Sequence, residues 1–439
     1  MAWVLRALGS TVVVDWHNLA FTIMEQTLRK EHPFIAPAKL YERAFSSAGD
    51  AHLCVTAAMQ AWLRAQWGVE ARVLHDRPPS FFRPLPPQER HELLRRLRPQ
   101  LVDAHGAPLW PAEGEAEAEG APWSPWAEGG TPWTTVGSGG RAVARAGAPA
   151  LLVSSTSWTA DEDFGLLLAA LKLLDEAIEQ QEGAAEAAGA EGAEGAEGAE
   201  GAAAAEAEGA EGAERAAAGG GALRVVAVIT GKGPLKAHYE ERIRLSPMRH
   251  VAVLTMWLEP EDYPRLLGAA SLGVCLHTSS SGLDLPMKVL DMLGCGLPVC
   301  AVGFPALPEL VTHGTNGLVF SSAPELAAQL TSLLARGAAP TAALQRLREA
   351  VTASEAGQPR WAENWRPIAP TPTPTLPPTL PPTLTLTLTL TLTPTRQAVA
   401  APLMERAPPS ARLSALRALP LLLLGYAARG ALAALYRAS

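Results

Sequence analysis

The sequence predicts an α/β fold in which helices cover a mostly parallel β-sheet. Two stretches indicate this class, because each passes from a continuous apolar run through a loop of small residues into a helix-like segment. They begin at Arg224 and Leu272. The carboxyl ends of parallel strands meet at one edge of a sheet, which is where such folds bind ligands. The two loops therefore predict a single binding site.

The upstream stretch is the apolar run 224–230, which is typical of a parallel strand buried on both faces. It ends in a glycine-rich turn that carries one cation, formed by Gly231, Lys232 and Gly233. A helical stretch follows from Leu235. A lysine among small residues at a strand end favours an anionic ligand.

The downstream stretch carries the most informative pattern. Its loop supplies hydroxyls and backbone N–H groups, and Pro286 then opens a helical segment. Lys288 and Asp291 share one face of that helix, where lysine suits a nucleotide's diphosphate and aspartate its ribose hydroxyls. The alternative is an incidental surface pair on a helix that begins with proline. The loop residues expected at the nucleotide are Ser279, Ser280, Ser281 and Gly282.

Five segments, taken in chain order, resemble the chitobiosyldiphosphodolichol β-mannosyltransferases of the endoplasmic reticulum. The resemblance covers roughly residues 10–85, 150–180 and 223–365, and the order of its motifs makes it specific. The segments that carry it are residues 12–18, 53–59, 151–164, 229–235 and 257–302.

The resemblance implies a GT-B fold, in which two Rossmann-like domains hold a sugar nucleotide between them. It implies GDP-mannose as donor and dolichyl-diphosphate-linked chitobiose as acceptor, with a β-1,4 linkage formed by inversion at the mannose anomeric carbon. It also implies the cytosolic face of the endoplasmic reticulum membrane, with other mannosyltransferases of lipid-linked oligosaccharide assembly as potential partners.

The domain organisation follows from composition and from the resemblance. We expect a partial N-terminal domain, incomplete because the family's usual membrane anchor and glycine loop are not found, and therefore weak activity from this chain alone. A nucleotide-binding domain follows a linker. The expected boundaries are 1–110 for the N-terminal domain, 111–149 for a low-complexity linker, 150–345 for the second domain with a Gly-Ala-Glu insertion at 183–222, 346–366 for a closing helix, and 367–439 for a Pro/Thr/Leu tract and an atypical tail.

Composition excludes some classes of function. The net charge of −8 comes largely from the Glu-rich repeat, and no basic stripe interleaved with aromatic residues indicates nucleic acid. The four cysteines lie in apolar contexts without metal-site spacing, so we expect them to be reduced and buried. They are Cys54, Cys275, Cys295 and Cys300.

Candidate catalytic residues follow the first apolar strand. An inverting transfer needs a base for the proton of the acceptor hydroxyl, and Asp15 and His17 are placed for that role. Alternatively, Asp15 caps the following helix and His17 binds backbone. Asp76, at another strand exit, either helps to hold the acceptor diphosphate or belongs to a turn.

Further candidates surround the nucleotide. Ser155, Thr156 and Ser157 follow a strand and are expected on the acceptor side. Trp257 and Leu258 are expected to line the base pocket; alternatively, Trp257 and Tyr263 are ordinary staples of a helix start.

The acidic run 161–163 superficially matches an Asp-x-Asp metal motif, but acidic residues also favour the first turn of a helix. We therefore expect no metal site there. Helix N-termini with Lys232 and Lys288 would offset the leaving diphosphate without a divalent cation.

One further class of function remains open from sequence. The chain could be a non-catalytic fragment that keeps a nucleotide-binding domain as a binding or scaffold module. A retaining hexosyltransferase is disfavoured, because relatives of that kind commonly carry an acidic residue where this chain has the loop 277–282.

Overall fold

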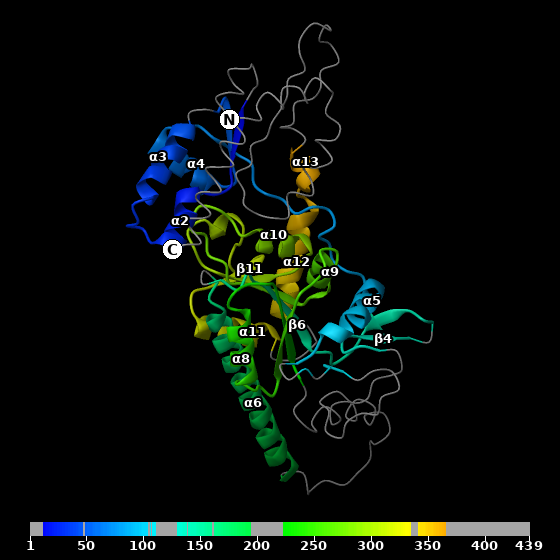
Figure 1. Cartoon of the computed structure of the whole chain (residues 1–439). Coiled ribbons are helices and arrows are strands. Elements are labelled where there is room, and N and C mark those ends of the chain that lie inside the picture. Colours follow the sequence, from blue (N-terminus) through cyan, green and yellow to red (C-terminus); the bar gives the residue numbers. More distant parts are fainter. Residues whose placement is uncertain are drawn as a thin grey trace.

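The computed structural model describes residues 12–365 except 47–48, 104–105, 107, 111–129, 138, 160–161, 195–222 and 335–340. Within these ranges the chain forms a six-stranded sheet, a three-stranded sheet and a two-stranded hairpin. The three-stranded sheet and its helices form the smaller unit (dark blue). It lies beside the larger unit, which is built on the six-stranded sheet (Figure 1). The expected tail at 367–439 lies outside the described residues.

The larger sheet is entirely parallel, as the two apolar stretches predicted. Its order is β11-β10-β9-β6-β7-β8, which becomes 3-2-1-4-5-6 from the far edge when β6 is counted as the first strand. The order reverses between β6 and β9, and this reversal is the ligand-binding edge of such sheets. The strands are β6 (Ala150–Ser155), β7 (Val225–Thr230), β8 (Val251–Met256), β9 (Leu272–Cys275), β10 (Val299–Val302) and β11 (Gly317–Phe320).

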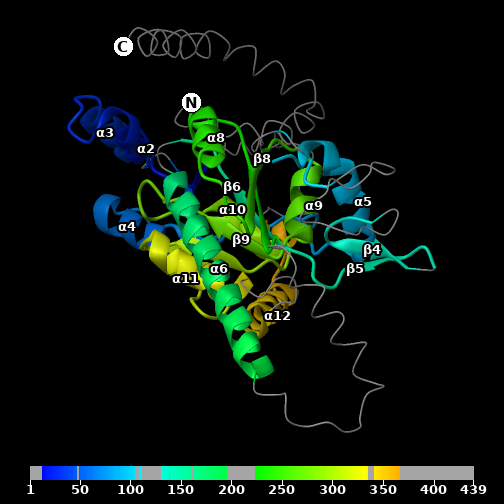
Figure 2. The ribbon, with the colours of Figure 1, turned by 90° about the horizontal axis from the view of Figure 1, so that it is seen from below.

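Alternate residues of these strands build two apolar layers, because successive side chains point to opposite faces. Leu151 and Val153 face one cluster with α9, α10 and part of α12, whereas Leu152 faces another with α6, α8 and α11. Helices therefore cover both faces (Figure 2). The helices are α6 (Phe164–Glu194), α8 (Lys236–Arg244), α9 (Asp262–Ala269), α10 (Met287–Gly294), α11 (Ala323–Leu334), α12 (Ala342–Ala356) and α13 (Trp361–Trp365), with the 3-10 turn η2 (Leu307–Glu309).

The smaller sheet has the order β1-β2-β3 and is also parallel. Its core gathers Trp16, Met59 and Leu63. Thr56 caps α4, and Gly68 ends that helix in the left-handed region, where a side chain would be strained. The elements are β1 (Val13–Trp16), α2 (Ala20–Leu28), α3 (Ile35–Ser46), β2 (Ala51–Cys54), α4 (Ala57–Trp67) and β3 (Arg72–Val73).

The described residues between Phe82 and Ala148 pack on the larger unit, whereas an N-terminal domain up to 110 and a linker at 111–149 were expected. Leu93, Leu94 and Trp133 are buried in the same cluster as Leu151. Composition did not predict this packing, because part of the low-complexity sequence expected as a linker separates Leu94 from Trp133 along the chain. The segment contains α5 (Pro87–Leu97), η1 (Arg98–Gln100) and the hairpin of β4 (Thr134–Val136) and β5 (Ala142–Ala144).

Helix α6 is longer than expected. It runs from Phe164 to Glu194 and so continues into the Gly-Ala-Glu insertion expected at 183–222. Alanine and glutamate are strong helix formers, so the start of the repeat can extend an existing helix. Residues 195–222 lie outside the described part. The closing segment forms two helices, α12 and α13, where one was expected.

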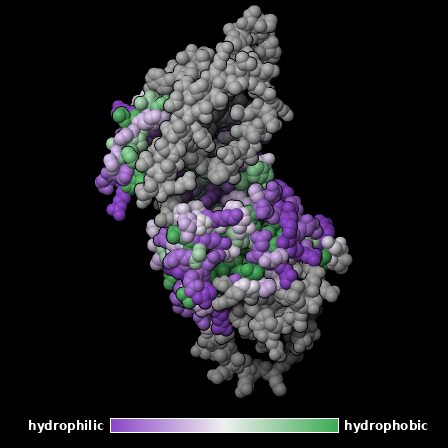
Figure 3. All heavy atoms as spheres, viewed as in Figure 1, coloured by the Kyte–Doolittle hydropathy of each residue, from purple (hydrophilic) through white to green (hydrophobic). Residues whose placement is uncertain are grey.

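The four cysteines are free and buried, as expected. Burial raises the pKa of the Cys275 thiol to about 11 and that of Cys300 to about 12, so both are poor nucleophiles. Hydrophilic and apolar side chains are interspersed on the visible face of the larger unit (Figure 3). None of the helices in the described ranges is long and apolar enough to cross a membrane.

Candidate functional site

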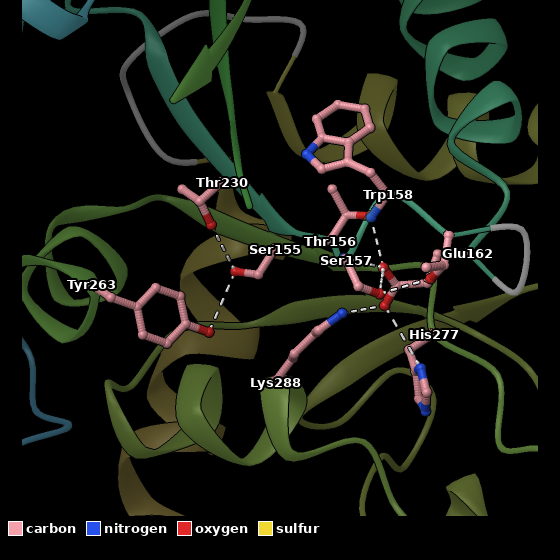
Figure 4. A network of polar contacts seen from close by, with 10 residues as sticks. Ser155, Thr156, Ser157, Trp158, Glu162, Thr230, Tyr263, His277 and Lys288 are labelled. Atoms are coloured by element: carbon pink, nitrogen blue, oxygen red, sulfur yellow. Dashed lines mark hydrogen bonds and ion pairs between the residues drawn. The ribbon is translucent and has the colours of Figure 1, made fainter. Parts of the chain in front are cut away.

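The polar side chains of the larger unit gather at the strand-order reversal. The segment after β6, the end of β7, the segment after β9 and the first turn of α10 meet there (Figure 4). Buried at the centre is Glu162, which is only 2% exposed. The arrangement agrees with the predicted place of a binding site in a sheet of this order.

One carboxylate oxygen of Glu162 is occupied by the loop after β6. Its Oε2 accepts hydrogen bonds from Thr156 Oγ1 at 2.7 Å, from the Ser157 backbone N–H at 2.6 Å and from Ser157 Oγ at 3.1 Å. Thr156 and Ser157, expected on the acceptor side, therefore bind an internal carboxylate.

The other oxygen faces two side chains from different elements. Glu162 Oε1 forms an ion pair with Lys288 Nζ and lies 3.6 Å from His277 Nδ1. Burial alone would raise the pKa of Glu162, but His277, Lys288 and Thr156 together hold it far below its usual range. Glu162 is thus a buried anion.

The sequence interpretation of Glu162 was wrong in its physical basis. It treated the residue as a first-turn acid stabilised by the helix dipole, whereas Lys288 and His277 stabilise the carboxylate. Asp161 lies outside the described residues. In the described part of the chain, no group of three or more His, Cys, Asp or Glu side chains is arranged to hold a metal ion.

A second chain of hydroxyls lies beside this network. Thr230 Oγ1 donates to Ser155 Oγ at 3.2 Å, and Ser155 Oγ donates to the Tyr263 hydroxyl at 3.3 Å. Burial raises the pKa of Tyr263, so its hydroxyl keeps its proton. Sequence treated Tyr263 as an ordinary helix staple, but it positions Ser155.

The glycines after β7 are required by close packing of two loops. A Cβ added to Gly231 would lie 1.8 Å from the Thr156 carbonyl oxygen, and one added to Gly233 would lie 1.8 Å from that of Ser157. The turn thus fixes the loop that binds Glu162. Lys232 Nζ lies 3.9 Å from the centroid of the Trp257 ring.

The neighbouring residues Trp257 and Leu258 differ in their exposure to solvent. Trp257 is 47% exposed, whereas Leu258 is buried in the core. The side chain of Leu258 is therefore unable to contact a base, which leaves its backbone and Trp257 as candidates.

The serine loop binds within itself and across to the smaller unit. Ser279 and Ser281 both donate to Asp284 Oδ1. Ser280 Oγ lies 3.0 Å from Thr22 Oγ1 of α2. Gly282 has φ 72°, which favours glycine. In this state the hydroxyls are engaged, so the backbone N–H groups are the better candidates for a ligand; Asp284 was not anticipated.

Asp291 stands apart from these networks. Its carboxylate makes no hydrogen bond or ion pair with any described residue, and burial raises its pKa to about 7. By surface area Asp291 is only partly buried, so its carboxylate is an acceptor that ligand hydroxyl groups could reach.

In the smaller unit, His17 lies between two carboxylates. His17 Nε2 is 2.8 Å from Asp15 Oδ2, and Nδ1 is 3.6 Å from Asp76 Oδ2. Burial lowers the pKa of His17, but Asp15 and Asp76 outweigh it and raise the pKa to about 9. His17 therefore carries a proton at neutral pH, which leaves Asp15 as the better base.

The alternative roles predicted for Asp15, as a helix cap, and for His17, as a partner of backbone groups, are wrong. Leu19 occupies the N-cap of α2 without a side-chain cap, and Glu42 accepts from the Ala20 and Phe21 N–H groups, so Asp15 does not cap this helix. His17 binds a carboxylate where backbone had been the alternative.

Polar contacts join the two units beside the serine loop. The Glu309 carboxylate accepts from Ala57 N at 2.7 Å and from Ala58 N at 2.8 Å, at the start of α4. Thr56 Oγ1 donates to the Leu283 carbonyl, and Leu283 packs on the core of the smaller unit. No sequence signal indicated that Glu309 would serve a helix so distant along the chain.

Comparisons with known proteins bear on this architecture. Residues 215–336 match the family model described as glycosyl transferases group 1. A mouse protein named chitobiosyldiphosphodolichol beta-mannosyltransferase is 42% identical over 359 residues, which are 82% of this chain and 64% of that protein. The human protein of that name is 40% identical, over 83% of this chain and 68% of its own length.

The chain belongs to the chitobiosyldiphosphodolichol β-mannosyltransferase family. Within this glycosyltransferase family the two parallel α/β units correspond to the GT-B arrangement, as predicted. An Arabidopsis relative, 41% identical over 84% of this chain and 71% of its own length, is named UDP-glycosyltransferase TURAN.

Similarity to solved structures is distant. Anabaena HepE in complex with UDP-glucose has a TM-score of 0.48 at 13% identity, over 82% of this chain and 71% of that one. WaaG, a glycosyltransferase involved in lipopolysaccharide biosynthesis, has a TM-score of 0.44 at 11% identity, over 81% and 73%. Similarity at this level indicates neither donor nor acceptor.

Proposed function

We propose that the chain transfers mannose from GDP-mannose to dolichyl-diphosphate-linked chitobiose, forming a β-1,4 linkage with inversion. The reaction would take place at the cytosolic face of the endoplasmic reticulum membrane. The names of the mouse and human relatives support the acceptor. The observation that carries the proposal is the placement of Lys288 and Asp291 at the strand-order reversal.

The donor side rests on α10. Lys288 lies in its first turn, where the helix dipole and an ammonium group both favour the leaving diphosphate. Asp291, one turn later and without a protein partner, would accept hydrogen bonds from ribose hydroxyls. Lys232 and Trp257 lie at the neighbouring strand end. With these groups the site chemistry requires no divalent metal.

The acceptor side rests on β1. Asp15 would take the proton of the acceptor hydroxyl as that oxygen attacks the anomeric carbon from the face opposite the diphosphate. His17 and Asp76 would hold Asp15 in place, because His17 contacts both carboxylates. Ser280 of the serine loop and the adjacent Leu283 bind Thr22 and Thr56 of the smaller unit, which supports a reaction centre between the two units.

The test begins with binding by the full chain. A fragment of residues 150–365 is unsuitable, because it would remove Leu93, Leu94 and Trp133 from the core of the larger unit. Calorimetric titration should give binding of GDP and much weaker binding of UDP. Preference for UDP would overturn the donor assignment. This comparison is included because the Arabidopsis relative is named a UDP-glycosyltransferase.

Transfer is the second step of the test. Membrane preparations with lipid-linked chitobiose and radiolabelled GDP-mannose should yield a lipid-linked trisaccharide, at a rate unchanged by EDTA. GDP binding without any transfer would instead favour the alternative, a nucleotide-binding module without catalysis.

A further inference from the structure

The contacts of Glu162 divide into two sets with different consequences. Three hydrogen bonds from Thr156 and Ser157 reach Oε2 and already hold the loop after β6. Oε1 contributes nothing to that loop. It faces Lys288 and His277, which come from α10 and from the segment after β9 (Figure 4).

The position of Lys288 gives the second set its meaning. Its side chain is 26% exposed, while its ammonium group contacts a carboxylate side chain that is only 1% exposed. A lysine side chain is flexible, and a fixed counter-ion restricts the positions that its ammonium group can occupy.

We propose that Glu162 is a positioning residue of the donor site, which holds the Lys288 ammonium and the His277 imidazole where the donor diphosphate binds. This inference rests on the proposed function, because it takes Lys288 as a diphosphate ligand. Glu162 does not touch the donor; it acts through the two side chains that it anchors. His277 thereby becomes a further residue of the donor site.

The sign of the effect separates positioning from simple electrostatics. Glu162 is an anion next to an anion-binding site, so removal of its charge alone should strengthen the binding of a diphosphate. Loss of positioning should weaken it. The variant Glu162→Gln keeps the shape and removes the charge, so the two effects oppose one another in one measurement.

The experiment is a GDP titration of the full chain and of three variants: Glu162→Gln, Lys288→Ala and the double variant. We expect Glu162→Gln to bind GDP roughly tenfold more weakly, the scale of one lost charge-assisted hydrogen bond. In the Lys288→Ala background the same change should have a clearly smaller effect, because only His277 then remains for Glu162 to position. Glu179 of α6 forms an ion pair with Arg249 at the surface, so the control variant Glu179→Gln should leave the GDP affinity unchanged.

A second variant covers the case in which Glu162→Gln does not fold. Thr156→Val keeps the Glu162 charge and removes the 2.7 Å hydrogen bond to Oε2, together with the hydrogen bond that Thr156 Oγ1 accepts from the Trp158 N–H. It should weaken GDP binding a few-fold, and less when Lys288 is absent.

Equal or tighter GDP binding by Glu162→Gln, with Lys288→Ala still weakened, would overturn the positioning role and leave the donor site intact. Fully additive effects in the double variant would also overturn it. If Lys288→Ala itself leaves GDP affinity unchanged, the donor assignment fails, and the inference fails with it.

Discussion

The two units carry buried charge networks of opposite pattern. In the larger unit an anion, Glu162, is held by Lys288 and His277. In the smaller unit a cation, His17, is held by Asp15 and Asp76. The pKa values move accordingly, because that of Glu162 falls and that of His17 rises to about 9.

The contrast teaches how each unit can serve the transfer. The Glu162 network holds the ammonium group of a partly exposed lysine, Lys288, which suits a diphosphate. In the proposed function, the His17 network leaves the Asp15 carboxylate to accept the proton of the acceptor hydroxyl. Variants of Asp15 and His17 change the smaller unit's network without changing that of Glu162.

The largest effect should follow from Asp15→Asn. Loss of a general base typically slows turnover by about 10²–10⁴-fold, and kcat for mannose transfer should fall on that scale. GDP affinity should stay the same, because Asp15 belongs to the other unit. An unchanged kcat would exclude Asp15 as the base and shift the assignment to His17.

The His17 network should weaken at high pH. The pKa of His17 in the folded chain, about 9, exceeds the ordinary value of 6.5, so its stabilisation is complete below pH 6.5 and is lost as pH rises through 9. The free energy of unfolding should drop by at most about 3 kcal/mol over that window. Urea unfolding at several pH values checks this, and His17→Gln should remove the dependence.

Asp291→Asn should separate stability from binding. Its folded pKa of about 7 lies above the ordinary 3.8, so the ionised carboxylate costs stability progressively from pH 4 to pH 7. The variant should gain about 1–3 kcal/mol at pH 8, with weaker GDP binding. A loss of stability at pH 8 would mean that Asp291 has a stabilising partner in the fold.

The smallest effect concerns the contact between the units. Glu309→Gln weakens the bonds to the start of α4 and should cost about 0.5–2 kcal/mol, the range for a helix cap. Glu325→Gln, which binds Ser321 within the larger unit, is the matched control. Melting temperatures of both variants would decide; an equal change would deny Glu309 a special role between the units.

The sequence predicted local features well. The continuous apolar strands predicted the parallel sheet, and Pro286 predicted the start of α10 beside Lys288 and Asp291. Contacts between distant segments could not be predicted. The sequence indicated an ordinary first-turn acid at Glu162, because its partner Lys288 is 126 residues away along the chain. Asp76, which follows β3, is likewise distant from His17 in the sequence and contacts it only in the folded chain.

The central claim is that donor binding and proton transfer are divided between the two units. GDP titrations of Lys288→Ala and Asp15→Asn, made side by side on the full chain, test it most directly. The account predicts about 10–100-fold weaker binding for Lys288→Ala, the scale of a charge-assisted hydrogen bond, and wild-type affinity for Asp15→Asn. Equal losses in both variants, or a loss only in Asp15→Asn, would contradict this division.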